Sequence, residues 1–226
     1  MTLIKDIINQ NKRLAKISKI VSDLSTESNI KSYLVGGCVR DLMLNPSADS
    51  IDIDIMVEGD GISFAKLLAK KMNVPKVVPF PKFATAKIPY HGYEIEVASA
   101  RLESYDKSSR NPSSIQISNI QDDLLRRDFT INAMAISLNE NNFGEFFDPF
   151  NGMEDLKNKI LKTPLNPDNT FSDDPLRMMR ACYFASKLSL EIEPECLLSI
   201  QNNSERISIV SQERITNELF KICLLY

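Results

Sequence analysis

Two spacings of apolar residues divide the chain, one of two residues and one of three to four. Strict alternation is typical of strands with one buried face, and the wider spacing is typical of helices. Alternation predicts strands at 32–35, 51–57, 77–78, 84–88 and 93–98, and one ending at 147. The wider spacing predicts helices at 4–25, 39–44, 62–73, 152–160, 175–188, 194–202 and 211–224. No alternation follows Asp173, so we expect an α+β part before about residue 165 and an all-helical part after it.

The segment 34–57 reads as strand, Gly-Gly turn, short helix, polar loop and strand. Asp52 and Asp54 alternate with isoleucines, which predicts one shared face and a separation of about 6.6 Å along a strand. Two carboxylates held this way can share a pair of divalent cations. Gly36 and Gly37 let backbone approach a ligand, and the next helix offers amides to phosphate. The combination favours phosphoryl or nucleotidyl transfer; a solvated strand face and an ordinary turn are the alternatives.

A third acid lies on another predicted strand. Glu94 and Glu96 occupy one face of 93–98, so Glu96 would join the aspartates if the two strands pair; a solvated face is again the alternative.

Residues 102–120 are rich in Ser, Asn and Pro and predict a mobile loop. A loop this long inside a compact domain is often functional.

Arginines gather in the second half of the chain. Arg126 and Arg127 supply forked donors suited to phosphate or ribose. Asp174, Arg177 and Arg180 recur every third residue, which predicts one polar stripe on a helix that begins at the 173–175 turn. An intrahelical ion pair is the alternative for this stripe.

Composition narrows the function classes. The 226 residues carry a net charge of −3, which argues against a general nucleic-acid binder but allows a local basic groove. The first twenty positions are rich in basic residues. These residues could form the wall of such a groove, or they could be the solvated face of a helix. The single histidine, His91, excludes a multi-histidine metal site and precedes Gly92 in a predicted hairpin turn. The four cysteines form no C-x-x-C pair, which favours free thiols in a reducing cytoplasm over disulfides or zinc. The sequence shows neither the apolar core of a signal peptide nor a run long enough to span a membrane.

Five segments resemble, in order, the motifs of the class II tRNA nucleotidyltransferase and bacterial poly(A) polymerase family. They are LVGGCVRDLML with DID, RRDFTINAMA, DPFNGMEDL, DDPLRMMR and SQERITNEL, over about residues 33–221. The resemblance implies an α+β fold: a DNA polymerase beta-like nucleotidyltransferase head with a mixed sheet at 1–165, then an all-helical, nucleotide-selecting neck at 166–226. Family members generally continue into body and tail domains, which are absent here, so missing domains or a partner are expected to cover the apolar edge of the last helix.

The resemblance also implies roles for individual residues. Asp52 and Asp54 match the aspartates that bind two Mg²⁺ ions, with Mn²⁺ as an alternative, and Glu96 matches the third carboxylate. The triphosphate, the ribose and the base would be bound by Gly36, Gly37, Arg40, Asp41, Arg127, Asp128, Asn132, Asp174, Arg177 and Arg180. An Asp–Arg pair one helical turn apart suits the Watson–Crick edges of ATP and CTP, because A and C both carry an exocyclic amino group.

The implied activity is template-independent addition of C, A or both to the tRNA 3′ end, from CTP and ATP. The 102–120 segment favours A or full CCA addition, since CC-adding specialists shorten it. Poly(A) polymerase shares all five motifs, and a non-catalytic RNA-binding relative is disfavoured by the intact carboxylates. Three positions depart from the family pattern: Asp173 replaces a glutamate, Tyr183 replaces an arginine, and Asn45 follows the first motif in place of glycine.

Overall fold

The computed structural model describes residues 4–47, 52–105 and 112–225, with backbone alone for 103–105 and 112–115. The chain forms two compact units, each assembled from separate segments. The first unit comprises Met1–Arg101, Ile117–Leu124 and Met134–Pro149. The second comprises Leu102–Gln116, Leu125–Ala133 and Phe150–Tyr226. The sequence boundary expected near residue 165 stays a prediction.

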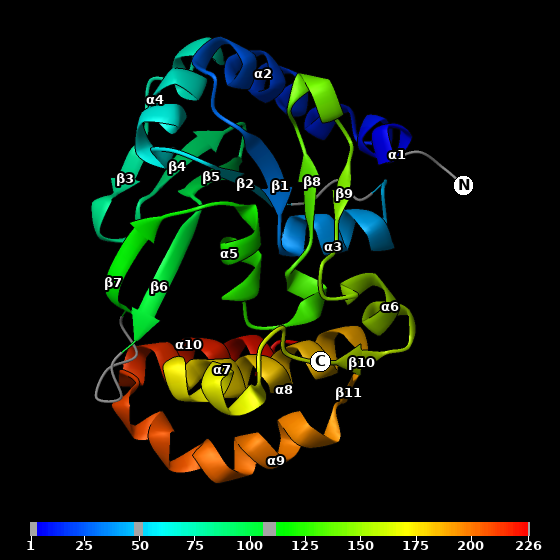
Figure 1. Ribbon diagram of the computed structural model, residues 1–226, viewed down its shortest axis with the longest axis vertical. Coiled ribbons are helices and arrows are strands. Elements are labelled where there is room, and N and C mark those ends of the chain that lie inside the picture. The colour runs from blue at the N-terminus through cyan, green and yellow to red at the C-terminus, as the bar shows by residue number, and fades with distance from the viewer. Residues whose placement is uncertain (1–3, 48–51, 106–111, 226) are drawn as a thin grey trace. The chain divides into compact units, whose positions relative to one another are not determined.

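The first unit is built on a seven-stranded mixed sheet with the order β3-β4-β5-β2-β1-β8-β9 (Figure 1). Its strands are β1 Ser32–Val35, β2 Ile53–Val57, β3 Val78–Phe80, β4 Thr85–Tyr90, β5 Tyr93–Ser99, β8 Ala135–Ser137 and β9 Phe146–Phe147. Strands β2 and β5 run parallel, and every other neighbouring pair in this sheet is antiparallel. The central strands bury Leu34, Ile55 and Ile95 completely or nearly so, which anchors the sheet in the core.

Several helices of the first unit pack against this sheet through buried apolar residues. The helices of this unit are α1 Ile4–Gln10, α2 Lys12–Ser28, α3 Gly37–Leu44, α4 Gly61–Lys71 and α5 Ile120–Leu125, with 3₁₀ turns η1 Pro81–Phe83 and η3 Glu140–Asn142. Figure 1 shows α2 and α4 along the same side of the sheet. Ile17 and Val21 of α2 and Phe64 and Leu68 of α4 are fully buried, so these two helices close the core.

Several expectations for the first unit are confirmed. Strand β1 has the predicted bounds. His91 and Gly92 form the predicted two-residue hairpin turn between β4 and β5, and both have positive φ, 47° and 84°. Such paired positive φ values fit the twist of the flanking strands. In both units the cysteines are free thiols, as predicted: Cys38 in the first, and Cys182, Cys196 and Cys223 in the second.

Two boundaries in the first unit were predicted wrongly. The helix expected at 4–25 divides at Asn11, whose side-chain Oδ1 accepts a hydrogen bond from the Leu14 amide at 3.0 Å and caps a new helix. Strand β2 begins at Ile53, so Asp52 precedes the strand. Residue 51 lies outside the described residues.

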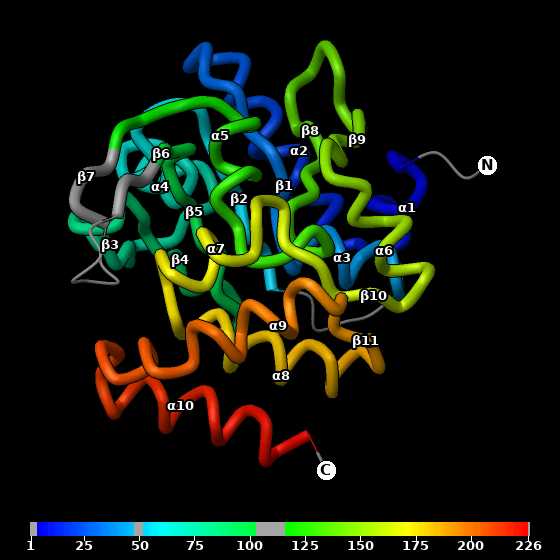
Figure 2. The backbone as a smooth tube through the Cα atoms, turned by 60° about the horizontal axis from the view of Figure 1, so that its bottom comes forward, coloured from blue at the N-terminus to red at the C-terminus, as the bar shows by residue number. Residues whose placement is uncertain are grey.

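The second unit is mainly helical. Its elements are α6 Gly152–Lys157, α7 Pro167–Asp173, α8 Leu176–Leu188, α9 Pro194–Asn203, α10 Gln212–Cys223, η2 Thr130–Asn132, η4 Ser204–Ile209 and strands β6 Arg101–Tyr105, β7 Pro112–Ile117, β10 Ile160–Leu161 and β11 Glu191–Ile192. Figure 2 shows α10 running beside α8. The core gathers aromatic residues from distant segments, with Phe129, Phe171 and Phe184 almost fully buried in one cluster.

Three expectations for the second unit need correction. The mobile loop predicted at 102–120 contains strands β6 and β7, which pair with each other; residues 106–111 lie outside the described residues. Strand β11 pairs in parallel with β10, so the part after Asp173 is not purely helical. Helix α7 was not predicted, although Pro167 after Asn166 is a typical helix start. The Asn166 side chain caps this helix by accepting a hydrogen bond from the Asp168 amide.

The apolar edge predicted on the last helix is present: Leu219, Phe220 and Leu224 are exposed. Among the described residues, no helix combines the length and the hydropathy that a bilayer crossing requires.

Candidate functional site

The parallel pairing of β2 with β5 sets Asp54 directly opposite Glu96. Residues in register on paired strands project from the same face, and adjacent strands lie about 4.8 Å apart. The opposite face carries Ile53, Ile55 and Ile95, all buried. Asp54 and Glu96 are half-buried. The sheet therefore brings together two of the three predicted carboxylates.

Asp52 lies two residues before Asp54 and is exposed. In the part of the chain that the structure describes, no group of three or more His, Cys, Asp or Glu side chains is arranged to hold a metal alone. Carboxylate oxygens nevertheless fit Mg²⁺, which is usually bound through one or two carboxylates together with water and substrate phosphates. The carboxylates of Asp52, Asp54 and Glu96 suit a magnesium ion that is bound jointly with a phosphate ligand.

The glycine turn lies at the end of β1. Gly36 has φ 69°, which favours glycine, and its carbonyl accepts from the Val39 and Arg40 amides at the start of α3. A Cβ added at Gly37 would lie 3.4 Å from Arg40 Nη2. Arg40 is buried and pairs with Asp41 Oδ1 at 2.7 Å. These contacts fix the turn predicted to approach a phosphate.

Cys38, in the first turn of α3, links this turn to the carboxylates. Burial raises the pKa of the Cys38 thiol strongly, and the negative charge of Asp54 raises it further. The glycine turn and the Asp54–Glu96 pair are therefore neighbours within the first unit.

Sequence reasoning missed Lys87 of β4. It is the register partner of Glu96 and forms an ion pair with Glu94 at 2.8 Å. Its hydrogen bond to Glu94 raises the pKa of Lys87, and the charges of Glu96 and Asp54 add to the effect. The alternation of Lys87 with buried Ala86 and Ile88 was the available signal.

In the second unit, Asp128 is the centre of a buried polar network. Its Oδ1 accepts from the Asn132 side chain at 3.0 Å and from the Phe129 amide at 2.9 Å. Its Oδ2 accepts from Arg180 Nε at 2.7 Å. Burial raises the pKa of Asp128, but Arg180, Asn132 and Arg177 outweigh burial and leave that pKa below its usual value. The second and fourth sequence motifs therefore meet at one carboxylate.

Arg127 and Arg177 contact the same segment of backbone. Arg127 Nη1 donates to the Asn132 carbonyl at 3.4 Å, and Arg177 Nη2 donates to the Arg126 carbonyl at 2.7 Å. Arg177 is buried, whereas Asp174 is half-buried and its Oδ1 accepts from the Leu176 amide at 3.2 Å. Asp174 precedes α8, so the polar stripe predicted on one helix is not formed as expected; Arg177 and Arg180 lie on α8 and support the 126–132 segment.

Glu218 of α10 was also missed. It is 5% exposed, its Oε1 accepts from Lys221 at 2.7 Å, and its charge raises the pKa of Arg180 after that of Asp128. The available signal was an acid placed at helical spacing between Ile215 and Ile222.

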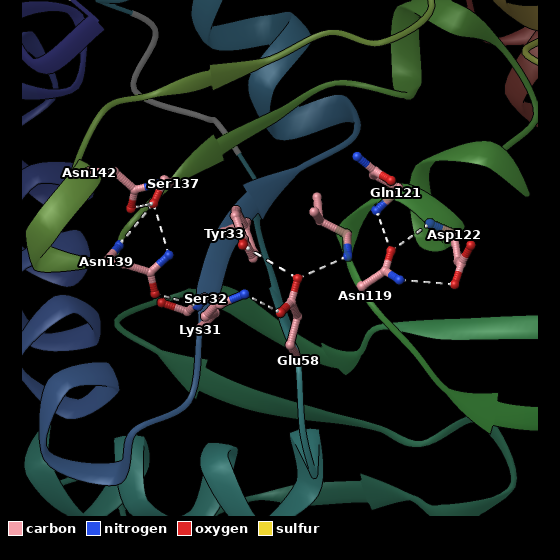
Figure 3. Close-up of polar contacts among 11 residues, drawn as sticks. Lys31, Ser32, Tyr33, Glu58, Asn119, Gln121, Asp122, Ser137, Asn139 and Asn142 are labelled. Atoms are coloured by element: carbon pink, nitrogen blue, oxygen red, sulfur yellow. Dashed lines mark hydrogen bonds and ion pairs between the residues drawn. The ribbon is translucent and has the colours of Figure 1, made fainter.

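A pocket of about 950 Å³ lies at the other end of β1 and β2 in the first unit. Glu58 lines the pocket, accepts hydrogen bonds from Tyr33 Oη and the Ile120 amide, and pairs with Lys31. Figure 3 shows its contacts with Tyr33 and Lys31. Burial, followed by the charge of Glu58, raises the pKa of Tyr33 to about 12. The lining includes Glu58, Glu140 and Glu145 against one lysine, so its charge does not suit a triphosphate.

A mixed sheet that carries paired carboxylates beside a glycine turn, followed by a helical part, defines the nucleotidyltransferase head fold. The chain belongs to the family described as the poly A polymerase head domain, whose model matches residues 32–162. A second model, described as the probable RNA and SrmB-binding site of polymerase A, matches residues 189–224.

Curated relatives carry tRNA-processing names. The A-adding tRNA nucleotidyltransferase of Aquifex aeolicus is 38% identical over 192 residues, which cover 84% of this chain and 23% of the relative. The CCA-adding enzyme of Lactobacillus helveticus is 35% identical over 197 residues, which cover 87% of this chain and 47% of the relative. The chain thus spans less than half the length of either protein.

Solved structures agree. A CCA-adding enzyme in an apo form superposes with a TM-score of 0.84 at 34% identity, covering 99% of this chain and 53% of that one. A tRNA nucleotidyltransferase complexed with a primer tRNA and an incoming ATP analogue gives a TM-score of 0.76 at 32% identity, covering 91% and 59%. The predicted family and fold class are confirmed.

Proposed function

We propose that this chain is the catalytic head and neck of an enzyme that adds C, A or both to the 3′ end of tRNA, using CTP and ATP without a template. The observation that carries the proposal is the Asp54–Glu96 register beside the Gly36 turn. The names of the relatives support the same substrates. Poly(A) polymerase is the second candidate, because the matching head-domain model bears that name.

Asp52 and Asp54, with Glu96 as the third carboxylate, would hold two Mg²⁺ ions, or Mn²⁺ in their place. When bound, the ions supply charge neutralisation on the triphosphate and a lowered pKa at the attacking hydroxyl. Gly37 would offer its backbone amide to the phosphates, Gly36, whose own amide donates to the Met134 carbonyl at 3.1 Å, would let the backbone approach them, and Arg40 with Asp41 would hold the turn in place.

The second unit supplies nucleotide selection in this proposal. Arg127, Asp128 and Asn132 form the ribose-side wall. Asp174 accepts from an exocyclic amino group, which A and C carry where G and U present a carbonyl. The guanidinium of Arg177 has five N–H donors, so its bond to the Arg126 carbonyl leaves donors for a base.

The transfer itself forms one bond and breaks one. The 3′-hydroxyl oxygen of the RNA bonds to the α-phosphorus of the nucleotide, its proton passes to water, and the bond to pyrophosphate breaks with its electrons leaving on pyrophosphate. The chain's own contribution is to orient the triphosphate at the glycine turn and to keep the carboxylates in register. We further propose that the reaction takes place in the cytoplasm, which fits the free thiols.

Single-turnover extension of three tRNA transcripts, ending at the discriminator base, at C and at CC, tests the proposal. Each transcript receives CTP, ATP or both with Mg²⁺, and the products are resolved at single-nucleotide length. Completed CCA on all three identifies a CCA-adding enzyme, and one A added only to the CC-ended transcript identifies an A-adding enzyme. Long A tails on unrelated RNA would establish the second candidate, and no incorporation despite ATP binding would contradict both.

A further inference from the structure

Three neighbouring strands of the first unit place a lysine and two carboxylates in one row. Lys87 of β4 is in register with Glu96 of β5, and Glu96 is in register with Asp54 of β2. The strands lie side by side in the order β4-β5-β2 (Figure 1). Because residues in register project from one face of a sheet, the three side chains share the face opposite the buried isoleucines. A positive charge is therefore built in beside the carboxylates that are proposed to hold metal ions.

The ammonium group of Lys87 has a defined position in this row. Its Nζ lies 2.8 Å from Glu94 Oε2, and the lysine side chain is 36% exposed. Glu94 lies two residues before Glu96 on the same face, so the ion pair runs diagonally between the two strands. The hydrogen bond with Glu94, helped by the charges of the neighbouring carboxylates, outweighs burial and raises the pKa of Lys87. The lysine is therefore cationic at neutral pH.

A fixed cation at this position opposes the binding of a second cation. Adjacent strands lie about 4.8 Å apart, so a metal ion held by Glu96 would lie within about 10 Å of the Lys87 side chain. Two positive charges at that separation repel each other where salt does not screen them. Glu94 stays charged whether or not the lysine is present, so the ion pair does not cancel the effect of removing Lys87. We therefore expect Lys87 to weaken the binding of a free divalent cation.

Nucleotide phosphates reverse the sign of this contribution. Mg²⁺ is usually bound through carboxylates together with substrate phosphates. A triphosphate carries more negative charge than one divalent cation neutralises, so an ammonium group attracts the complex of the two. The same lysine thus opposes a cation that arrives alone and does not oppose one that arrives with a triphosphate. Lys87 would therefore couple the binding of the two ligands.

We propose that Lys87 is a charge-compensating residue that keeps the affinity of the Asp54–Glu96 pair for a free divalent cation low, so that the cation binds mainly together with the nucleotide triphosphate. The proposal rests on the proposed function for the nature of the second ligand. It gives Lys87 no contact with the reacting atoms, because the lysine acts only through its charge on what the carboxylates bind.

Binding of Mn²⁺ to the nucleotide-free protein is measured by electron paramagnetic resonance at low ionic strength. Lys87→Gln should bind Mn²⁺ about three- to tenfold more tightly than the wild type, and the gain should shrink as KCl is added. Lys87→Arg keeps the charge and should bind Mn²⁺ as the wild type does. Adding Asp54→Asn to Lys87→Gln should abolish the gain. A gain that survives this second change would place the ion elsewhere and overturn the proposal.

Binding of the Mn²⁺–ATP complex is measured by equilibrium dialysis at saturating Mn²⁺. Lys87→Gln should bind this complex no more tightly than the wild type does. An equal gain for free Mn²⁺ and for the complex would overturn the proposal, because the lysine would then repel the cation in either state. Unchanged Mn²⁺ affinity with weaker binding of the complex would also overturn it, because Lys87 would then be a direct ligand of the phosphates.

The matched control is Lys71→Gln. Lys71 of α4 forms an ion pair with Glu27 at 2.5 Å, and the two side chains are 32% and 59% exposed, against 36% and 59% for Lys87 and Glu94. Each variant removes one such ion pair, but only Lys87 is in register with a carboxylate of the proposed metal site. The Mn²⁺ affinity of Lys71→Gln should equal that of the wild type. An equal gain in both variants would reflect net charge alone and would overturn the proposal.

Thermal unfolding gives a readout that does not require a fully stable variant. Added Mn²⁺ should raise the melting temperature of Lys87→Gln by more than that of the wild type or of Lys71→Gln, because a ligand of the folded state stabilises it according to its affinity. Equal shifts in all three proteins would contradict the proposal.

Extension of tRNA by the wild type is followed in parallel. Extension together with equal Mn²⁺ affinities of the wild type and Lys87→Gln would overturn the role of Lys87 and leave the proposed function standing. No extension, with the expected differences in Mn²⁺ affinity, would do the reverse.

Discussion

Asp128 and Arg180 form an ion pair with two bonds to one oxygen: Oδ2 of Asp128 accepts from Nε and from Nη2 of Arg180, each at 2.7 Å. The carboxylate is buried, and the arginine side chain is 33% exposed. The pair joins the 126–132 segment to α8 within the second unit. Its strength therefore bears on the stability of the whole network around Asp128.

Asp128→Asn should lower the free energy of unfolding at about pH 7 by about 2–3 kcal/mol, less than for a fully buried pair because Arg180 is partly solvated. The folded-state pKa of Asp128 is lowered, so its contribution is present above the unfolded pKa of about 3.9 and is lost as pH falls through the folded value. Urea denaturation should therefore show a large difference from the wild type near neutrality and a small one in acid. Glu191→Gln, at an exposed position of the same unit, should change stability by less than about 0.5 kcal/mol at either pH.

Asp54→Asn should reduce single-turnover extension by about 10³-fold, because several kcal/mol of transition-state stabilisation depend on the cation that the carboxylate would hold. Glu94→Gln is the matched control: Glu94 shares a strand and a face with Glu96 but pairs with Lys87 and lies outside the β2–β5 register. That variant should extend tRNA within a few-fold of the wild type, and circular dichroism should be unchanged in both. Equal losses in the two variants would show that the strand face as a whole, and not the registered pair, governs the rate.

Gly61 begins α4 against the end of β5. A Cβ added there would lie 2.7 Å from the Ser99 nitrogen and 2.8 Å from the Ala98 carbonyl carbon, both backbone atoms. Gly61→Ala should therefore destabilise the protein by about 1–3 kcal/mol in chemical denaturation. Gly59→Ala is the control, because its Cβ would meet only the flexible Ile30 side chain at 3.5 Å. A neutral Gly61→Ala would mean that α4 and β5 are not packed this closely.

Two of the four cysteines should react quickly with an alkylating reagent in the folded protein, and the other two should not. Cys182 and Cys223 are exposed, whereas Cys38 and Cys196 are buried. Burial raises the pKa of both buried thiols, and at Cys38 the charge of Asp54 adds to it. Because thiolates are the reactive form, two cysteines should be labelled in the folded protein and all four in denaturant. Mass spectrometry of the labelled peptides identifies them, and rapid labelling of Cys38 in the folded state would contradict the packing of α3.

Sequence patterns predicted the parts of the fold in which local signals agree with burial. Strand β1 and the His91–Gly92 turn were placed correctly, because alternation and turn chemistry act over a few residues. Strands β6 and β7 were missed, because their segment is rich in Ser, Asn and Pro, which are turn signals, and the apolar alternation of Ile115 with Ile117 is too short to outweigh them. The break at Asn11 was missed because the apolar stripe continues across it, and the Asn11 cap is visible only in the structure.

The candidate site was predictable by residue type and only partly by arrangement. Asp54 and Glu96 were expected to be neighbours if their strands paired, and the parallel register makes them so. The orientation of Arg177 toward a backbone carbonyl was not predictable, since it depends on a segment about fifty positions earlier in the chain. Lys87 was overlooked for the same reason: its importance comes from a neighbouring strand and not from its own segment.

The register between β2 and β5 also limits the ways in which this protein can misfold. A slip of β5 by one residue would expose Ile95 and Val97 to water and force Glu96 into the apolar interior. Burial of the apolar face of the sheet therefore selects the register that aligns the carboxylates on the other face. A one-residue misalignment of Asp54 and Glu96 should therefore cost the protein its fold as well as its activity.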